Sequence, residues 1–296
     1  MKILVTGSNG LLGQKLSALL MEKGISFLAT GVGENRNPSL PSEHYRTMDV
    51  TSASSMESVF QEFQPTHVIH GAAMTNVDAC ETDREGCWSL NVTATELLVE
   101  ICSDKNIHLT HVSTDFIFDG KNGPYREEDQ PNPLSFYGES KLKAEEVVKA
   151  GTLPHAILRT VLVYGITPHM SRSNIVLWAK GALEKGQTIS VVNDQFRTPT
   201  LAEDLAMGCY LAATKNAQGV FNISGKDFMS IFQLVERVAK YFQLSTENVV
   251  QVSSSTLNQA AQRPPITGFI LDKAAAELGY APHSFEEGIA VMEKQW

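Results

Sequence analysis

Long apolar runs are missing from this 296-residue sequence. No stretch approaches the roughly 18 apolar residues that a membrane-spanning helix needs, so we expect no membrane partner. The first apolar run, residues 3–5, ends two residues before Gly7, which is too short for the core of a secretory signal. These absences predict a cytoplasmic protein.

Paired cysteines and metal-binding clusters are also missing. The four cysteines are Cys80, Cys87, Cys102 and Cys209. None forms a CxxC pair, so we expect reduced, mostly buried thiols. The histidines near residues 67–70 and 108–111 have no carboxylate placed with them. Core or edge histidines are therefore favoured over metal ligands.

A basic excess is the third absence, because the formal net charge is −9. A broad nucleic-acid surface needs a basic face, so the charge argues against a nucleic-acid partner. Local arginines can still bind an anionic ligand inside an acidic protein.

Short apolar segments alternate with helical patterns in the first half of the chain. Strands are predicted near residues 3–5, 27–29, 68–69 and 109–113, and helices near 12–20, 54–62 and 84–105. Such alternation predicts an α/β fold with a Rossmann-type, doubly wound parallel sheet.

The second half of the chain is less regular. Helices are predicted at 171–186, 201–214 and 229–242, a strand followed by a turn that stops at Pro199 over residues 189–200, and a short strand at 221–225. We therefore expect a nucleotide-binding domain over residues 1–165, completed by returns from later segments. Residues 166–296 are expected to form mainly a smaller substrate-binding lobe at the carboxyl edge of the sheet.

The stretch GSNGLLG follows the first strand and opens the first helix. Gly7 suits a tight turn, Gly10 lets the backbone approach a pyrophosphate, and Gly13 lets helix and strand pack closely. The helix N-terminus then faces the anion. The predicted cofactor-binding residues of this loop are Gly7, Ser8, Asn9, Gly10, Leu11, Leu12 and Gly13.

The end of the second strand indicates which dinucleotide is bound. NAD enzymes usually place an acid there on the ribose hydroxyls, but Gly31 stands at this position and Arg36 follows. This favours NADP(H), while nearby Glu34 keeps NAD(H) as an alternative. Asp49 and Val50 are candidates for adenine contact, although Asp49 could instead cap the next helix.

The stretch FYGESK places Tyr137 and Lys141 one helical turn apart. A free phenol titrates near ~10, and an adjacent ammonium lowers that pKa. Tyr137 is then a candidate proton donor to a carbonyl oxygen as hydride arrives, and Lys141 also a candidate ligand of the cofactor ribose. A nearby hydroxyl would complete the site, and Ser113 and Thr114 end a strand.

At these motifs the chain resembles the extended short-chain dehydrogenase/reductases, and more narrowly the dTDP-4-dehydrorhamnose reductase family. The matching pieces are GSNGLLG, HGAAMTNVDACE, STDFIFDG, PYREEDQPNPLSFYGESKLKAEE, LRTVLVYG, NDQFRTPT and QRPP, which span roughly residues 1–265. The resemblance implies NADPH-dependent reduction of the C4 keto group of a nucleotide-activated deoxysugar. A homodimer is compatible with it, since reductases of this class are often dimers.

The resemblance also implies residue roles. It makes Thr114 the catalytic hydroxyl, Tyr137 the acid and Lys141 its helper. The stretch Gly71, Ala72 and Ala73 would line the cofactor, and Asn91 occupies a place where many such reductases keep an asparagine. The candidates on the substrate side are Thr75, Asn76, Asp78, Thr114, Asp115, Asp194, Gln195, Pro199 and Thr200. Helix caps remain an alternative for Thr75 and Asp78, an ordinary helix residue for Asn91, and a turn for Asp194.

Three arginines are candidates for a substrate diphosphate, since arginine matches phosphate oxygens bidentately. They are Arg172, Arg197 and Arg263, and solvated surface arginines are the alternative for each.

Three positions depart from the family pattern. Leu162 stands where rhamnose enzymes often carry tryptophan, which favours a changed sugar pocket and leaves another keto-sugar reductase or epimerase open. Lys15 stands where some members hold a metal through glutamate, so no metal site is predicted. Arg197 replaces a small residue, and with PYREED this is similar to the regulatory beta subunit of methionine adenosyltransferase. That similarity implies a second hypothesis, an NADP-binding regulatory partner.

Overall fold

The computed structural model describes residues 1–170, 173–256 and 259–295. A seven-stranded parallel sheet forms its centre, in the order β3-β2-β1-β4-β5-β6-β11. The strands of this sheet are β1 (Lys2–Thr6), β2 (Ser26–Gly31), β3 (Tyr45–Thr47), β4 (His67–His70), β5 (His108–Thr114), β6 (His155–Thr160) and β11 (Gly219–Asn222). This confirms the predicted Rossmann-type sheet.

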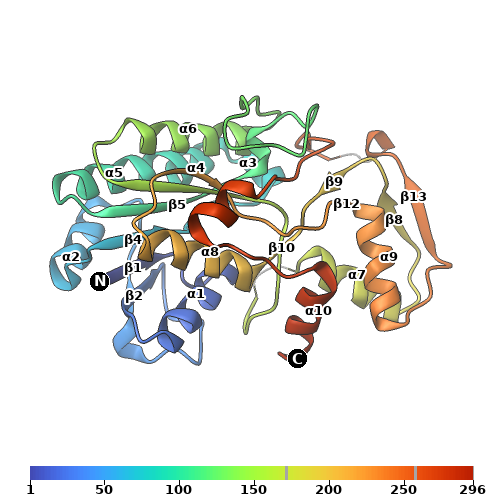
Figure 1. Cartoon of the computed structure of the whole chain (residues 1–296), viewed down its shortest axis with the longest axis horizontal. Coiled ribbons are helices and arrows are strands. Elements are labelled where there is room, and N and C mark those ends of the chain that lie inside the picture. Colours follow the sequence, from blue (N-terminus) through green and yellow to red (C-terminus); the bar gives the residue numbers. More distant parts are fainter. Residues whose placement is uncertain (171–172, 257–258, 296) are drawn as a thin grey trace.

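Helices cover both faces of the sheet (Figure 1). One face is covered by α1 (Leu11–Glu22), α8 (Ala202–Thr214) and the π-helical turn η5 (Ala274–Leu278), and the other by α2 (Ala53–Phe63), α5 (Ala94–Asp104) and α6 (Phe136–Ala150). Strand β1 shows the two-sided burial, because Ile3 and Val5 join the first core and Leu4 joins the second. All three are at most 1% exposed, which explains why the strand lacks polar alternation.

The predicted helix over residues 84–105 is interrupted. It consists of α4 (Arg84–Trp88), a π-helical turn η2 (Ser89–Thr93) and α5, and α3 (Val77–Thr82) precedes it. The widened turn contains the buried Asn91, whose side chain bonds outside the helix. Such bulges recur at functional sites.

A second lobe lies to the right in Figure 1, around a separate apolar core. It contains α7 (Ile175–Glu184), α9 (Ile231–Phe242) and α10 (Phe285–Glu293), with the parallel pair β8 (Ile189–Val192) and β13 (Val249–Val252). Short pairs connect the lobes: β7 (Val163–Tyr164) with β10 (Thr200–Leu201), and β9 (Phe196–Arg197) with β12 (Met229–Ser230).

Two elements from the second half return to the central sheet. β11 adds its edge strand beside β6, and α8 packs on α1. These two elements are later segments that pack with the first domain. The division of the chain near residue 165 remains a proposal. None of the helices among the described residues is long and apolar enough to cross a membrane.

Candidate active site

The predicted site residues lie mostly at the carboxyl edge of the parallel sheet. The loops after β1, β2, β4 and β5 all leave the sheet at this edge, because the four strands run in the same direction. In open α/β sheets this edge is where ligands bind.

The glycine loop has the shape that a dinucleotide pyrophosphate requires. Gly7 has φ +71°, and a Cβ there would lie 2.7 Å from the Ala72 backbone nitrogen. A Cβ on Gly13 would lie 2.5 Å from the Gly7 oxygen. No side chain caps α1 at Gly10, so the first amides of the helix are available to an anion. The Ser8 hydroxyl is buried without a protein partner, which also fits a bound phosphate.

Asn9 connects the glycine loop to the loop after β2. Its Nδ2 donates to the Glu34 carbonyl at 3.0 Å and to the Tyr45 hydroxyl at 3.1 Å, and its Oδ1 accepts from the Arg36 amide at 2.8 Å. The Arg36 side chain is exposed and, within the described part of the chain, has no carboxylate partner. It is therefore free to meet a 2′-phosphate.

Asp49 does not cap α2, so that alternative is wrong. Ser52 is the cap and accepts from the Ser55 amide at 3.3 Å. Asp49 instead accepts from the amide and the hydroxyl of Thr51 at 2.9 and 2.7 Å. Its place after β3, with the buried Val50, keeps adenine contact as a prediction.

The loop after β4 carries Gly71, Ala72 and Ala73 and is tied down at both ends. The Ala72 amide donates to the Thr6 hydroxyl at 3.3 Å. Asn91 binds both sides of the Met74 backbone, accepting from its amide at 2.8 Å and donating to its carbonyl at 3.2 Å.

Asn91 also reaches the helix that carries the tyrosine. Its Nδ2 donates to the Ser140 hydroxyl at 2.9 Å, and Ser140 donates to the Tyr137 carbonyl at 2.8 Å. Asn91 is therefore more than an ordinary helix residue, because its amide couples the expected cofactor loop to α6.

The first turn of α6 packs tightly against the loop after β5. Ser135 caps the helix and accepts from the Gly138 amide at 3.2 Å. A Cβ on Gly138 would lie 2.3 Å from the Phe116 carbonyl oxygen, so only glycine permits this approach. The approach brings the Tyr137 side chain close to that of Thr114, whose hydroxyl acts to lower the pKa of the phenol.

The environment of Tyr137 keeps the phenol protonated. Burial raises the pKa of Tyr137, the Thr114 hydroxyl lowers it, and the Asp115 carboxylate raises it further. The net pKa lies above the ordinary value. This corrects the expectation of a lowered pKa for the protein alone. A protonated phenol suits a group that donates a proton.

Lys141 is buried and does not offset this effect. Its Nζ donates to the Val112 carbonyl at 2.8 Å and lies 3.3 Å from His111 Nε2. Burial lowers the pKa of Lys141 to about 8, with Glu145 and Cys87 opposing the shift. The ammonium is therefore anchored on β5 rather than on the phenol.

A buried ion pair holds α6 against the sheet. Glu145 accepts from Arg159 Nε at 3.0 Å and Nη2 at 2.8 Å, and from the Ser113 hydroxyl at 2.7 Å. Glu145 is 0% exposed and Arg159 2%. Lys149 adds a contact at 3.0 Å from the solvent side. Ser113 thus anchors the helix, and Thr114 is the hydroxyl beside the tyrosine.

Asp115 and Arg197 form a second buried pair, with Arg197 Nε 3.7 Å from the carboxylate. The guanidinium also donates to the carbonyls of Phe196, Pro264 and Pro265 at 2.7, 2.7 and 3.1 Å. Arg197 is 4% exposed. The alternative of a solvated surface residue is therefore wrong, and the diphosphate role stays a prediction that would require Arg197 to leave some of the protein's own acceptors.

Asp78 and Arg263 pair with each other. Arg263 Nη1 and Nη2 meet the two carboxylate oxygens at 3.2 and 2.7 Å, and the Ala261 amide donates to the same carboxylate at 3.0 Å. The Arg263 bonds lower the pKa of Asp78. Asn76, not Thr75 or Asp78, caps α3. Arg263 would bind a phosphate only by leaving this carboxylate.

The remaining second-lobe candidates have structural partners. Asp194 accepts from Ser254 and Ser253 at 2.8–3.0 Å, so its side chain ties the end of β8 to the segment after β13 rather than closing a local turn. The Thr200 hydroxyl donates to the Val161 carbonyl at 2.6 Å, and the Ile231 amide donates to the Gln195 carbonyl. Arg172 lies outside the described residues.

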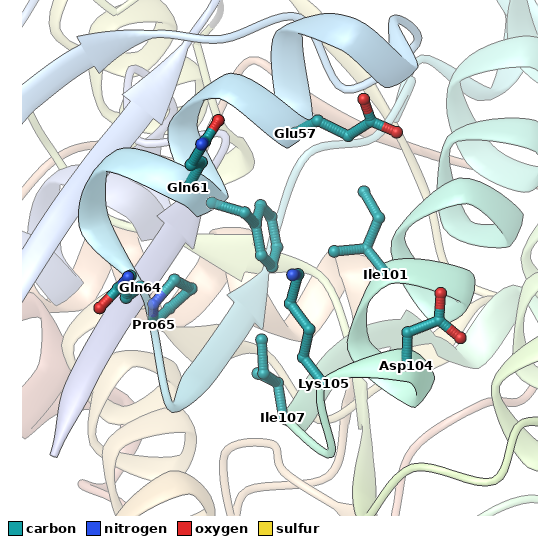
Figure 2. Close-up of a pocket in the computed structure, with 9 residues that line it drawn as sticks. Glu57, Gln61, Gln64, Pro65, Ile101, Asp104, Lys105 and Ile107 are labelled. Carbon is teal, nitrogen blue, oxygen red and sulfur yellow. The ribbon is translucent and has the colours of Figure 1, made fainter.

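A hollow of about 610 Å³ lies elsewhere, between the ends of α2 and α5 (Figure 2). Pro65 and Ile107 line it, and they lie two residues before β4 and one residue before β5. It therefore opens at the amino edge of the sheet, away from the glycine loop.

Among the described residues no group of three or more His, Cys, Asp or Glu side chains could hold a metal, and Lys15 pairs with Glu203 at 3.0 Å.

Fold and site together define an NAD(P)-dependent oxidoreductase of the extended short-chain dehydrogenase/reductase class. The chain belongs to the RmlD substrate binding domain family, whose model matches residues 1–296. The predicted resemblance is thereby confirmed.

Three relatives illustrate what the chain is similar to. The structure of dTDP-4-dehydrorhamnose reductase from Bacillus anthracis, solved with NADP, matches this chain with a TM-score of 0.87 at 26% identity. The match covers 100% of this chain and 99% of the Bacillus anthracis chain. A probable low-salt glycan biosynthesis reductase, Agl14, of Haloferax volcanii is 28% identical, over 98% of this chain and 96% of its own. Methionine adenosyltransferase 2 subunit beta of Danio rerio is 30% identical, over 89% of this chain and 80% of its own.

Proposed function

We propose that the chain reduces the C4 keto group of a nucleotide-activated deoxysugar with NADPH, converting dTDP-4-dehydrorhamnose to dTDP-rhamnose. The observation that carries this proposal is the buried pair of hydroxyl side chains, Thr114 and Tyr137, at the same edge of the parallel sheet as a loop that fits a pyrophosphate. The NADP in the Bacillus anthracis reductase structure supports the choice of cofactor.

The chain's own residues supply binding and proton transfer. The α1 amides and Ser8 hold the pyrophosphate, and Arg36 meets the 2′-phosphate. The nicotinamide, when bound, supplies the hydride. Thr114 steadies the keto oxygen, and Tyr137 donates its proton to that oxygen. Lys141 binds the cofactor ribose through the N–H of its ammonium that is not bonded to β5.

The test follows loss of reduced nicotinamide absorbance with dTDP-4-dehydrorhamnose as substrate. Tyr137→Phe keeps the ring and removes the proton, so we expect kcat to fall about 100- to 10,000-fold, as when a general acid is lost. Tyr241→Phe is the matched control, because that tyrosine lies on α9 and bonds Glu293. Equal activity of both variants would reject the role of the phenol.

A second candidate function follows from the 30% identity to methionine adenosyltransferase 2 subunit beta. In this case the chain binds NADPH and acts as a subunit of a methionine adenosyltransferase. NADPH binding without turnover of the keto-sugar, together with a stable complex with the adenosyltransferase catalytic chain, would favour it. Turnover lost in Tyr137→Phe would reject it.

A further inference from the structure

The ammonium of Lys141 has two fixed acceptors on β5. Its Nζ lies 2.8 Å from the Val112 carbonyl and 3.3 Å from His111 Nε2, and the lysine is 3% exposed. An ammonium carries three N–H donors. Two of them are thus directed into the sheet, and one remains for a ligand at the site.

His111 can only be an acceptor for this ammonium. An ammonium donates, so Nε2 accepts and the ring proton resides on Nδ1. Burial and the charge of Lys141 hold the pKa of His111 well below its ordinary value, which keeps the ring neutral. His111 is 0% exposed, and within the described ranges of the chain its Nδ1 has no hydrogen-bond partner.

The lack of a hydrogen-bond partner at Nδ1 distinguishes two roles for His111, a proton relay and a fixed hydrogen-bond acceptor. A proton relay needs a protein group beyond Nδ1, and among the described residues no side chain or backbone group bonds that atom. A fixed acceptor needs only Nε2. An unsatisfied buried N–H is a cost that few proteins carry without a reason, and holding Lys141 with an uncharged acceptor supplies one.

The ring of His111 is itself held in place. It lies against His70, with centroids 5.4 Å apart, and the two residues are register partners on β5 and β4. His70 Nδ1 bonds the Thr6 hydroxyl at 2.7 Å, and the same hydroxyl accepts from the Ala72 amide. His111 is therefore packed on a side chain that also supports the expected cofactor loop.

We propose that His111 is a positioning residue for Lys141: it accepts one donor of the buried ammonium and so aims the remaining N–H at the cofactor and tyrosine. The proposal rests on the proposed function and deepens it. The titratable groups around the lysine are Glu145 on α6 and Cys87 on α4, with His111 and, behind it, His70 on the side of the sheet. Tyr137 lies one turn away on α6. Among the elements around the lysine, β5 provides the two hydrogen-bond acceptors of the Lys141 ammonium.

The test measures the titration of Lys141 directly in the free protein. The ε carbons of lysine are labelled with ¹³C, and the Lys141 signal is assigned by its loss in Lys141→Met. In the wild type we expect a midpoint at about 8. In His111→Leu we expect it about one pH unit lower, the roughly tenfold change that loss of a hydrogen bond to a charged group brings.

Two variants make the result specific. His111→Gln places an amide oxygen where Nε2 was, so the midpoint should return towards that of the wild type. His108→Leu is the matched control: His108 is the neighbouring histidine on β5, its ring centroid lies 5.5 Å from that of His67, and it bonds the Ala217 carbonyl instead of Lys141. That variant should leave the Lys141 midpoint unchanged.

The outcomes separate this proposal from the proposed function. If His111→Leu does not fold, His111→Asn takes its place, because its amide reaches only as far as Nδ1. An unchanged Lys141 midpoint in the folded variant would overturn the positioning role. The positioning role is supported if the Lys141 titration midpoint falls and the alkaline limb of the pH profile of kcat/KM shifts to lower pH with it. A lowered midpoint in a protein that reduces no keto-sugar supports the contact and rejects the proposed function alone.

Discussion

Replacing Arg159 by methionine tests the anchor of the helix that carries Tyr137 and Lys141. Arg159→Met removes two bonds to Glu145, at 3.0 and 2.8 Å, and one to the Glu127 carbonyl at 2.9 Å. The Glu145 carboxylate, 0% exposed, would keep its charge without its main partner. Breaking a buried pair in this way costs about 3–5 kcal/mol.

Unfolding monitored by circular dichroism at pH 7 measures that cost. At roughly 2 °C per kcal/mol for a chain of this size, we expect Tm to fall by about 6–10 °C. Lys149→Met is the control, because Lys149 meets the same carboxylate from the solvent side and is 42% exposed. Such a surface contact is worth about 0.2–1 kcal/mol.

The double variant Glu145→Met/Arg159→Met completes the cycle. Apolar side chains of similar volume can replace a buried pair at little cost, so we expect the double variant to regain much of the stability lost in Arg159→Met. If Arg159→Met were no less stable than Lys149→Met, the burial of the pair would not matter in the way described.

Three further predictions concern the same region. Gly7→Ala places a Cβ 2.7 Å from the Ala72 nitrogen at φ +71°; we expect a loss of about 1–3 kcal/mol of stability and weaker NADPH binding by titration, and unchanged binding would contradict the loop geometry. Arg197→Met leaves Asp115 buried without its cation and should cost about 3–5 kcal/mol in urea unfolding, whereas a phosphate ligand at the surface would change KM and spare stability. Burial raises the pKa of Glu145 but Arg159 lowers it more, so the pKa of Glu145 in the folded protein lies below the ordinary value. The stability that the ionised carboxylate contributes is present above about pH 4.3 and is lost as the pH falls through the folded pKa. We therefore expect the Tm of Glu145→Gln to fall less on acidification than the Tm of the wild type.

The local motifs could be predicted from the sequence because their geometry depends on spacing. The glycine loop follows directly from Gly7, Gly10 and Gly13 after a strand, and the Tyr137–Lys141 pair from one helical turn. The sheet followed from the strand–helix alternation. In each case the residues that decide the structure are near neighbours in the chain.

The ion pairs could not be predicted, because their partners are distant. Arg263 and Asp78 are 185 residues apart, and Arg197 meets Pro264 across 67 residues. A charged residue in the sequence does not reveal whether its partner is a ligand or another side chain. The contact of His111 with Lys141 was missed for the same reason. The equal spacing of two histidines on adjacent predicted strands was the available signal, because parallel pairing places them side by side.

The return of β11 and α8 to the central sheet has a consequence for folding during synthesis. Helix α1 buries its apolar side against α8, and β6 remains an open edge until β11 pairs with it. β11 ends at Asn222 of the 296 residues, so a nascent chain that already carries every predicted catalytic residue still lacks one strand of its sheet. Domains usually fold in order as they leave the ribosome. Here the seven-stranded sheet is complete only after residue 222 has been synthesised, well into the second half of the chain.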